Sequence, residues 1–186
     1  GTIAKKIISS IEDGFLPVNT TILEIGAHHG YLLADIIQII YTLNPKLLES
    51  LNFAIVERFE NLQEQQIKYI YESFGDIIKL KHYHDIRDVK LENAYVLANE
   101  IFDAFGCDLV YTNKENILQQ AFVSDNKIEF IDCIDDNIIN HCNKYSITKG
   151  EVALSYKDFT NTICENINSF EFLTFDYGDR FPRNDF

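Results

Sequence analysis

Apolar residues near the start of the chain follow helical and strand spacings in turn. In Ile3–Ile11 they recur every three or four positions, which predicts an amphipathic helix that Gly14 and Pro17 end. Thr21–Ile25 is a short, β-branched run and predicts a buried strand. Apolar residues are too dense in Tyr31–Leu43 for a surface helix. We therefore expect that segment to form a helix lying on a sheet.

The same alternation continues to about residue 100. Polar and apolar positions predict further strands at Leu51–Val56, Ile77–Tyr83 and Asn93–Ala98, with a helix at Leu62–Phe74. Strands that alternate with helices favour right-handed crossover units and a parallel sheet. The expected fold is therefore α/β: a Rossmann-like, doubly wound, mostly parallel sheet.

The region from about residue 107 to 150 breaks this alternation. Shorter strands are predicted there, with Asp125–Asn126 as a turn, and they are Leu109–Thr112, Ile117–Val123 and Lys127–Ile131. We interpret the region as a small insertion or cap after the fourth strand of a single domain that spans residues 1–186. A helix at Ser155–Ser169 and a last strand at Glu171–Phe175 follow it.

Composition and charge exclude several classes of function. The chain has 186 residues, of which 46% are hydrophobic, and its net charge is −13. Such an acidic surface repels phosphate backbones, and no block of Lys and Arg offsets it, so we expect no nucleic-acid partner. A basic or arginine-bearing protein partner is compatible with this charge.

The sequence has no signal for membrane insertion, for secretion or for metal binding. No apolar run is long enough to span a membrane, and Glu12 and Asp13 interrupt the place of a signal-peptide core. The four cysteines are widely spaced and include no CxxC pair, so we expect reduced thiols and no metal site. We also expect the protein to be bacterial and cytoplasmic. The chain contains no methionine, which suggests a fragment of a longer protein.

The segment Ile22–Tyr31 is the strongest candidate for a ligand-binding turn. It runs from a strand through Gly26 and Gly30 into a helix, so backbone N–H groups can approach a ligand closely. An ordinary strand-to-helix turn is the alternative interpretation. His28 and His29 lie in the same turn, where adjacent histidines more often have no chemical role.

Three carboxylates favour a binding site over an ordinary turn. Glu24, Glu57 and Asp85 lie at the ends of three successive predicted strands, where ligands of such sheets bind. Glu24 could hold the ammonium of an amino-acid moiety. Glu57 could take both ribose hydroxyls, and Asp85 would lie over an adenine.

The fourth strand ends in a second polar block. Asn99 and Glu100 should project beside the reactive end of a cofactor, with Asp103 one helical turn from Glu100. Paired carboxylates there could orient a guanidinium, although acids at a helix N-terminus are the plainer interpretation. Asp176 and Tyr177 follow the last strand and could close the pocket, or form a simple turn.

These blocks together resemble the MidA family of methyltransferases, whose mitochondrial relatives assist the assembly of respiratory complex I. The resemblance rests, in family order through nearly the whole chain, on Leu23–Leu32, Val56–Glu57 with Leu62 and Gln66, Ala98–Ala104 and Phe175–Gly178. It implies a class I methyltransferase fold and S-adenosyl-L-methionine as the methyl donor. In mitochondrial members it implies a protein arginine as the acceptor.

The resemblance also implies roles for particular residues. Glu24, Gly26 and Gly30 would line the methionine moiety, and Glu57 the ribose, while Ala27 is expected to be a further cofactor-binding residue. The remaining expectations are Asp85 and Asn99 as further cofactor-binding residues, Asn99, Glu100 and Asp103 as catalytic residues, and Asp176 and Tyr177 as substrate-binding residues.

The chain departs from the family at two places. His28 stands where the family turn usually has a glycine, and Phe105–Gly106 stand where a leucine–proline usually follows. The leading hypothesis is a methyltransferase acting on a protein arginine. The alternative is a catalytically weak or inactive assembly factor that binds a partner protein. A nicotinamide-dependent oxidoreductase would need a closer GxGxxG match.

Overall fold

The computed structural model describes residues 1–178, which form two compact units. The first unit comprises Gly1–Ile101 and Asn161–Asp176. The second comprises Phe102–Thr160 together with residues 177 and 178. The region interpreted as an insertion, residues 107–150, falls inside the second unit.

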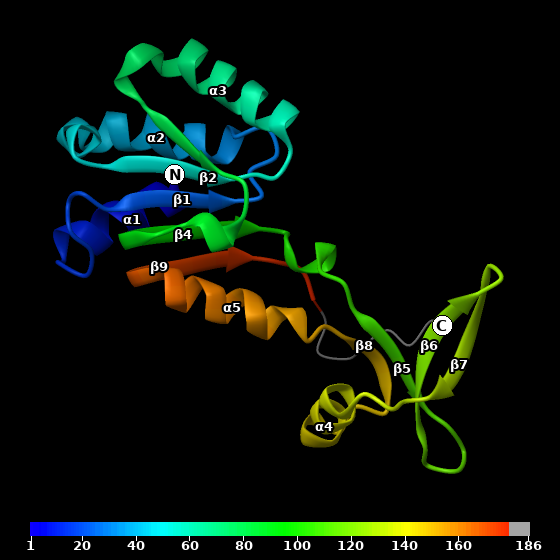
Figure 1. The fold of residues 1–186 in the computed structure, drawn as a ribbon. Helices are drawn as coiled ribbons and strands as arrows, with labels where there is room; N and C mark the ends of the chain where they lie inside the picture. The colour runs from blue at the N-terminus through cyan, green and yellow to red at the C-terminus, as the bar shows by residue number, and fades with distance from the viewer. Residues whose placement is uncertain (179–186) are drawn as a thin grey trace. The chain divides into compact units, whose positions relative to one another are not determined.

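The first unit is built on a five-stranded sheet in the order β3-β2-β1-β4-β9, and every neighbouring pair is parallel. Figure 1 shows β2, β1, β4 and β9 side by side in that order. The strands are β1 (Thr21–Ile25), β2 (Asn52–Val56), β3 (Leu80–Tyr83), β4 (Leu91–Asn99) and β9 (Ile167–Phe175). The predicted parallel α/β sheet is therefore confirmed.

The order of the strands determines where a ligand can bind. The chain runs from β1 outward to β2 and β3, then returns to place β4 on the other side of β1. In open α/β sheets, ligands bind outside the carboxyl ends of the strands at the point where the order reverses. Here that point lies between the ends of β1 and β4, where Ile25 is opposite Ala98.

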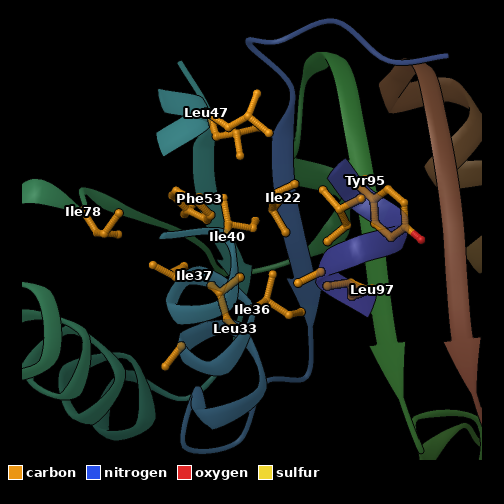
Figure 2. Packing of buried hydrophobic residues seen from close by; sticks show 14 of the residues in the cluster. Ile22, Leu33, Ile36, Ile37, Ile40, Leu47, Phe53, Ile78, Tyr95 and Leu97 are labelled. Carbon is orange, nitrogen blue, oxygen red and sulfur yellow. The ribbon is translucent and has the colours of Figure 1, made fainter. Parts of the chain in front are cut away.

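Three helices contribute to the apolar core on one face of this sheet: α1 (Thr2–Glu12), α2 (Tyr31–Leu43) and α3 (Glu60–Phe74). Figure 2 shows side chains of α2, among them Ile37 and Ile40, directed at the strands that carry Ile22 and Phe53. Ile22, Ile37 and Ile40 are completely buried. The helix α2 therefore lies on the sheet, as its dense apolar pattern predicts.

Three predicted boundaries are wrong by three residues or more, and one of them is the start of the last strand, which lies at Ile167 and not at Glu171. The third strand begins at Leu80 and not at Ile77, because Gly75–Ile77 forms a short 3₁₀ helix. The helix α5 (Ser155–Asn166) ends at Asn166, and the following residues form β9 instead of three further helical positions.

Side-chain hydrogen bonds account for the end of α5. Asn166 is buried, donates to the carbonyl of Ile86 at 2.9 Å and accepts from Lys90. From Ile167 onward the backbone pairs with β4, beginning opposite Leu91. These long-range partners outweigh the local helical pattern, which sequence alone cannot reveal.

The second unit contains a four-stranded antiparallel sheet in the order β7-β6-β5-β8. Its strands are β5 (Asp108–Thr112), β6 (Leu118–Ser124), β7 (Lys127–Asp132) and β8 (Lys149–Val152), and one helix, α4 (Asp136–Tyr145), belongs to it. The first three strands were predicted from the sequence. The helix and β8 were not.

The missed elements bury few side chains, although Ile138, Ile139 and Cys142 of α4 do have helical spacing. Helix α4 buries only Ile138 and Cys142, and β8 buries only Val152. These three residues form a small core with Val110. Asp135 is a further local signal, because its side chain caps α4 by accepting from the Asn137 N–H at 2.8 Å.

Among residues 1–178, no helix is both long enough and apolar enough to cross a membrane.

Candidate functional site

The turn between β1 and α2 needs its two glycines. Gly26 and Gly30 have φ angles of +71° and +77°, a left-handed conformation that glycine adopts without steric cost. A Cβ atom on Gly26 would lie 3.2 Å from the Cγ2 atom of Ile101, just beyond β4. A side chain at Gly26 would therefore crowd Ile101, in the segment that follows β4, and force a shift of a few tenths of an ångström.

Glu24 lies beneath this turn, near the end of β1. Its side chain is only 3% exposed, and among the described residues its Oε2 atom is buried without a hydrogen-bond partner. Burial raises the pKa of Glu24 to about 7, although a hydrogen bond from the Leu33 N–H lowers it in part. A buried carboxylate with an unpaired oxygen is costly unless a cation or donor completes it. The site chemistry thus favours a ligand ammonium.

Glu57 directly follows β2 and is also buried. Its Oε1 atom accepts from the Phe59 N–H at 3.0 Å, and its backbone carbonyl accepts from the Gln63 side chain at 2.6 Å. These bonds hold the residue in one orientation at the carboxyl end of the sheet. That location agrees with the strand-end acid expected from the sequence.

Asp85 follows β3 but already has a protein partner. The Arg87 guanidinium donates to both of its carboxylate oxygens, at 2.8 and 2.7 Å, and holds its pKa down at about 2. Asp85 also caps the 3₁₀ helix Ile86–Asp88, and Asp88 completes the capping box. The sequence interpretation overlooked this spacing of acids, which is a helix-start signal. A contact of Asp85 with adenine stays a prediction.

The end of β4 presents Asn99 and Glu100, both exposed. The Glu100 N–H donates to the carbonyl of Phe175 at 2.8 Å, so this end lies beside the end of β9. Glu100 has a φ of +50°, which is strained for a residue other than glycine. The predicted helical spacing to Asp103 is wrong, because Asp103 lies in the separate 3₁₀ helix Phe102–Ala104.

Two other predicted residues meet in the second unit. The Tyr177 hydroxyl donates to the Oδ2 atom of Asp103 at 2.9 Å. The two residues are 74 positions apart, so the contact follows from the fold rather than from local sequence. Asp176, the last residue of the first unit, directly precedes Tyr177.

Gln66 and His82 are part of the turn's surroundings, and the sequence interpretation gave neither a role. Gln66 is completely buried on α3, and its amide nitrogen donates to the carbonyl of His28 at 2.7 Å. The Oε1 atom of Gln66 lies 2.8 Å from the Nε2 atom of His82 on β3. Gln66 is matched by the family resemblance, but a single buried glutamine has no local sequence pattern that predicts its role.

His28 adopts a backbone conformation that favours glycine, the residue that the family resemblance leads us to expect at this position. Its φ is +49°, in the left-handed region. Its side chain is exposed, and its ring meets the ring of His29 with centroids 3.9 Å apart. The substitution therefore strains the backbone of the turn.

Two solved structures from Burkholderia thailandensis resemble this chain. One is described as a COG1565 superfamily member and likely methyl transferase bound to S-adenosyl-homocysteine; it has 18% identity and a TM-score of 0.74, and the match covers 96% of this chain and 46% of that one. The other, an uncharacterized protein of the same superfamily, has 17% identity and a TM-score of 0.67, with coverages of 90% and 45%. This chain spans about half the length of these proteins. At such identities the likeness shows a shared fold.

No curated protein matches the sequence. A family model does match it, over residues 2–185, and that family is described as "Putative S-adenosyl-L-methionine-dependent methyltransferase". The match covers almost the whole chain and confirms the MidA-like resemblance. With the parallel sheet, the glycine turn and the buried Glu24 at its expected position, the chain belongs to this family of S-adenosyl-L-methionine-dependent methyltransferases.

Proposed function

We propose that this domain binds S-adenosyl-L-methionine at the carboxyl ends of β1, β2 and β4, and that the protein methylates an arginine side chain of another protein. The main support is the unpaired, buried Oε2 atom of Glu24 directly below the glycine turn. A ligand ammonium would supply the missing partner. The Burkholderia structure bound to S-adenosyl-homocysteine supports the same choice of ligand.

The residues present fit this cofactor. Glu24 would hold the ammonium group, while Gly26, Ala27 and Gly30 would let the backbone approach the methionine moiety. Glu57, fixed at the end of β2, would take the ribose hydroxyls. The bound cofactor supplies a methyl group on a sulfonium, ready for displacement by a nucleophile.

The protein's part in the transfer is positioning and proton removal. Asn99 and Glu100 stand exposed at the end of β4, next to the glycine turn that Ile101 touches. The Glu100 carboxylate would accept hydrogen bonds from a guanidinium and hold it in one orientation. Glu100 or Asp103 would accept the proton that the substrate nitrogen loses when it is methylated.

The choice of arginine rests on charge. A net charge of −13 attracts a cationic segment of a partner, and a carboxylate suits a planar guanidinium. The same charge supports the prediction that no nucleic acid binds. A bacterial cytoplasmic location also stays a prediction.

We expect Glu100→Gln and Asp103→Asn each to lower methyl transfer by at least about 100-fold, because each loses a charged guanidinium contact or the proton acceptor. Affinity for S-adenosyl-homocysteine should stay within about threefold, since the proposed cofactor contacts lie elsewhere. Mass spectrometry of an arginine-rich peptide incubated with cofactor measures the transfer. Asp125→Asn, an exposed acid in the β6–β7 turn, is the matched control. Transfer at the wild-type rate in both site variants would show that these carboxylates have no catalytic role.

A second candidate function is that of a catalytically weak assembly factor that binds a partner protein. The observation that favours it is His28, which strains the turn where the family usually has glycine. Isolating the partner with the full-length protein and detecting a methylated arginine on it, absent from a Glu100→Gln strain, would exclude this alternative.

A further inference from the structure

Gln66 joins three elements beneath the glycine turn. It is completely buried on α3, donates to the His28 carbonyl in the turn at 2.7 Å, and faces His82 of β3 at 2.8 Å. It also lies against the start of α2, since a Cβ atom on Gly30 would be 3.4 Å from its Cγ atom. No other side chain among the described residues bonds to the backbone of the 26–30 turn.

The two hydrogen bonds of Gln66 determine each other's direction. The amide nitrogen must face the His28 carbonyl, because a carbonyl oxygen can only accept. The amide oxygen therefore faces His82, whose Nε2 atom must carry a hydrogen in order to donate to it. Burial lowers the pKa of His82, opposed in part by the charge of Glu57, so the neutral ring with its hydrogen on Nε2 is the expected state.

The Gln66 bond also fixes the plane of the peptide between His28 and His29. This peptide is trans and planar, so its N–H points opposite to its carbonyl. With the carbonyl directed at α3, the His29 N–H is directed away from α3. Among residues 1–178 no acceptor hydrogen-bonds to this N–H. It is an available donor in a left-handed turn, of the kind that binds anions.

We propose that Gln66 and His82 are positioning residues that hold the 28–29 peptide so that the His29 N–H meets the carboxylate of the bound cofactor. This inference rests on the proposed function for the identity of the ligand. Glu24 and the His29 N–H would then recognise the two charged groups of one amino-acid moiety. The turn would keep this geometry despite the strain at His28.

The test replaces Gln66 with methionine, which keeps the length and burial of the side chain but neither hydrogen bond. Calorimetric titration should give S-adenosyl-homocysteine binding that is about tenfold weaker than in the wild type. Nitrogen NMR of the His82 ring should show the hydrogen on Nε2 in the wild type and a mixture of tautomers in the variant. Gln65→Met, one position away on the exposed side of α3, should change neither quantity.

A second pair of variants separates positioning from packing. His82→Gln retains a donor and should bind the ligand within about twofold of wild type, whereas His82→Phe should bind about three- to fivefold more weakly. Unchanged affinity in Gln66→Met, or a His82 ring with its hydrogen on Nδ1 in the wild type, would overturn the inference.

Failure of the proposed function has a different signature. If wild-type protein binds no S-adenosyl-homocysteine, the ligand assignment is wrong. The carbon NMR resonance of the His28 carbonyl then shows whether Gln66 holds the 28–29 peptide. A displaced resonance in Gln66→Met, with none in Gln65→Met, would still support control of the peptide by Gln66. An unchanged resonance would overturn it.

Discussion

Replacing Gly26 with valine is expected to abolish binding of S-adenosyl-L-methionine. The φ of +71° costs a branched residue about 1–2 kcal/mol, and the new Cβ atom would meet Ile101 at 3.2 Å. The turn must therefore shift, and its N–H groups lose the alignment that a close-fitting ligand needs. A fall in affinity of at least about 100-fold should be measurable by calorimetry.

Gly14 provides the matched control for this experiment. It has a similar φ of +79°, but nothing lies within 4 Å of a Cβ atom placed on it. Gly14→Val should thus cost about the same 1–2 kcal/mol in urea unfolding and leave ligand affinity unchanged. Equal affinities in the two variants would mean that the turn at Gly26 is not the binding site.

Replacing Glu24 with glutamine is expected to stabilise the fold at high pH while weakening the cofactor complex. Burial raises the pKa of this carboxyl from 4.5 to about 7. Each pKa unit corresponds to about 1.4 kcal/mol, so ionising Glu24 in the folded protein costs about 3 kcal/mol. Because the folded pKa is the higher one, the stabilising contribution is complete below about pH 4.5 and is lost as pH rises through about 7.

The Glu24→Gln variant lacks this titration. Its free energy of unfolding should exceed that of the wild type by about 2–3 kcal/mol at pH 8 and by little at pH 4.5, as measured in urea. Its affinity for S-adenosyl-homocysteine at pH 8 should fall by about 100-fold, because the ammonium loses a buried charge partner. A stability difference that is the same at both pH values would contradict the assigned pKa. Unchanged affinity would remove Glu24 from the site.

Much of the first unit could be predicted because local pattern and tertiary role agree there. The β-branched run of β1, the dense apolar face of α2 and the glycines between them each indicate the same arrangement. The carboxyl ends of parallel strands lie at one edge of the sheet. The sequence alone therefore predicts that Glu24 and Glu57 lie at that edge.

Other features depend on contacts between residues distant in sequence. Gln66 and His28 are 38 positions apart, and Asp103 and Tyr177 are 74 apart, so no spacing rule connects them. Asp85 was interpreted without regard to Arg87, whose pairing with it is visible only in three dimensions. Glu100 has a left-handed backbone conformation, which prevents a helical turn from Glu100 to Asp103. A glutamate gives no indication of this conformation in the sequence.

The central claim is that the chain holds S-adenosyl-L-methionine through Glu24. The most direct test is a calorimetric titration of the wild-type protein with S-adenosyl-homocysteine at pH 7. Two buffers with different ionisation enthalpies give the number of protons released on binding. A group with a pKa of about 7 is half protonated at that pH, and a ligand ammonium beside it drives it to the carboxylate. We expect binding at one site with release of about half a proton per ligand. No binding, or binding without proton release, would contradict the central claim.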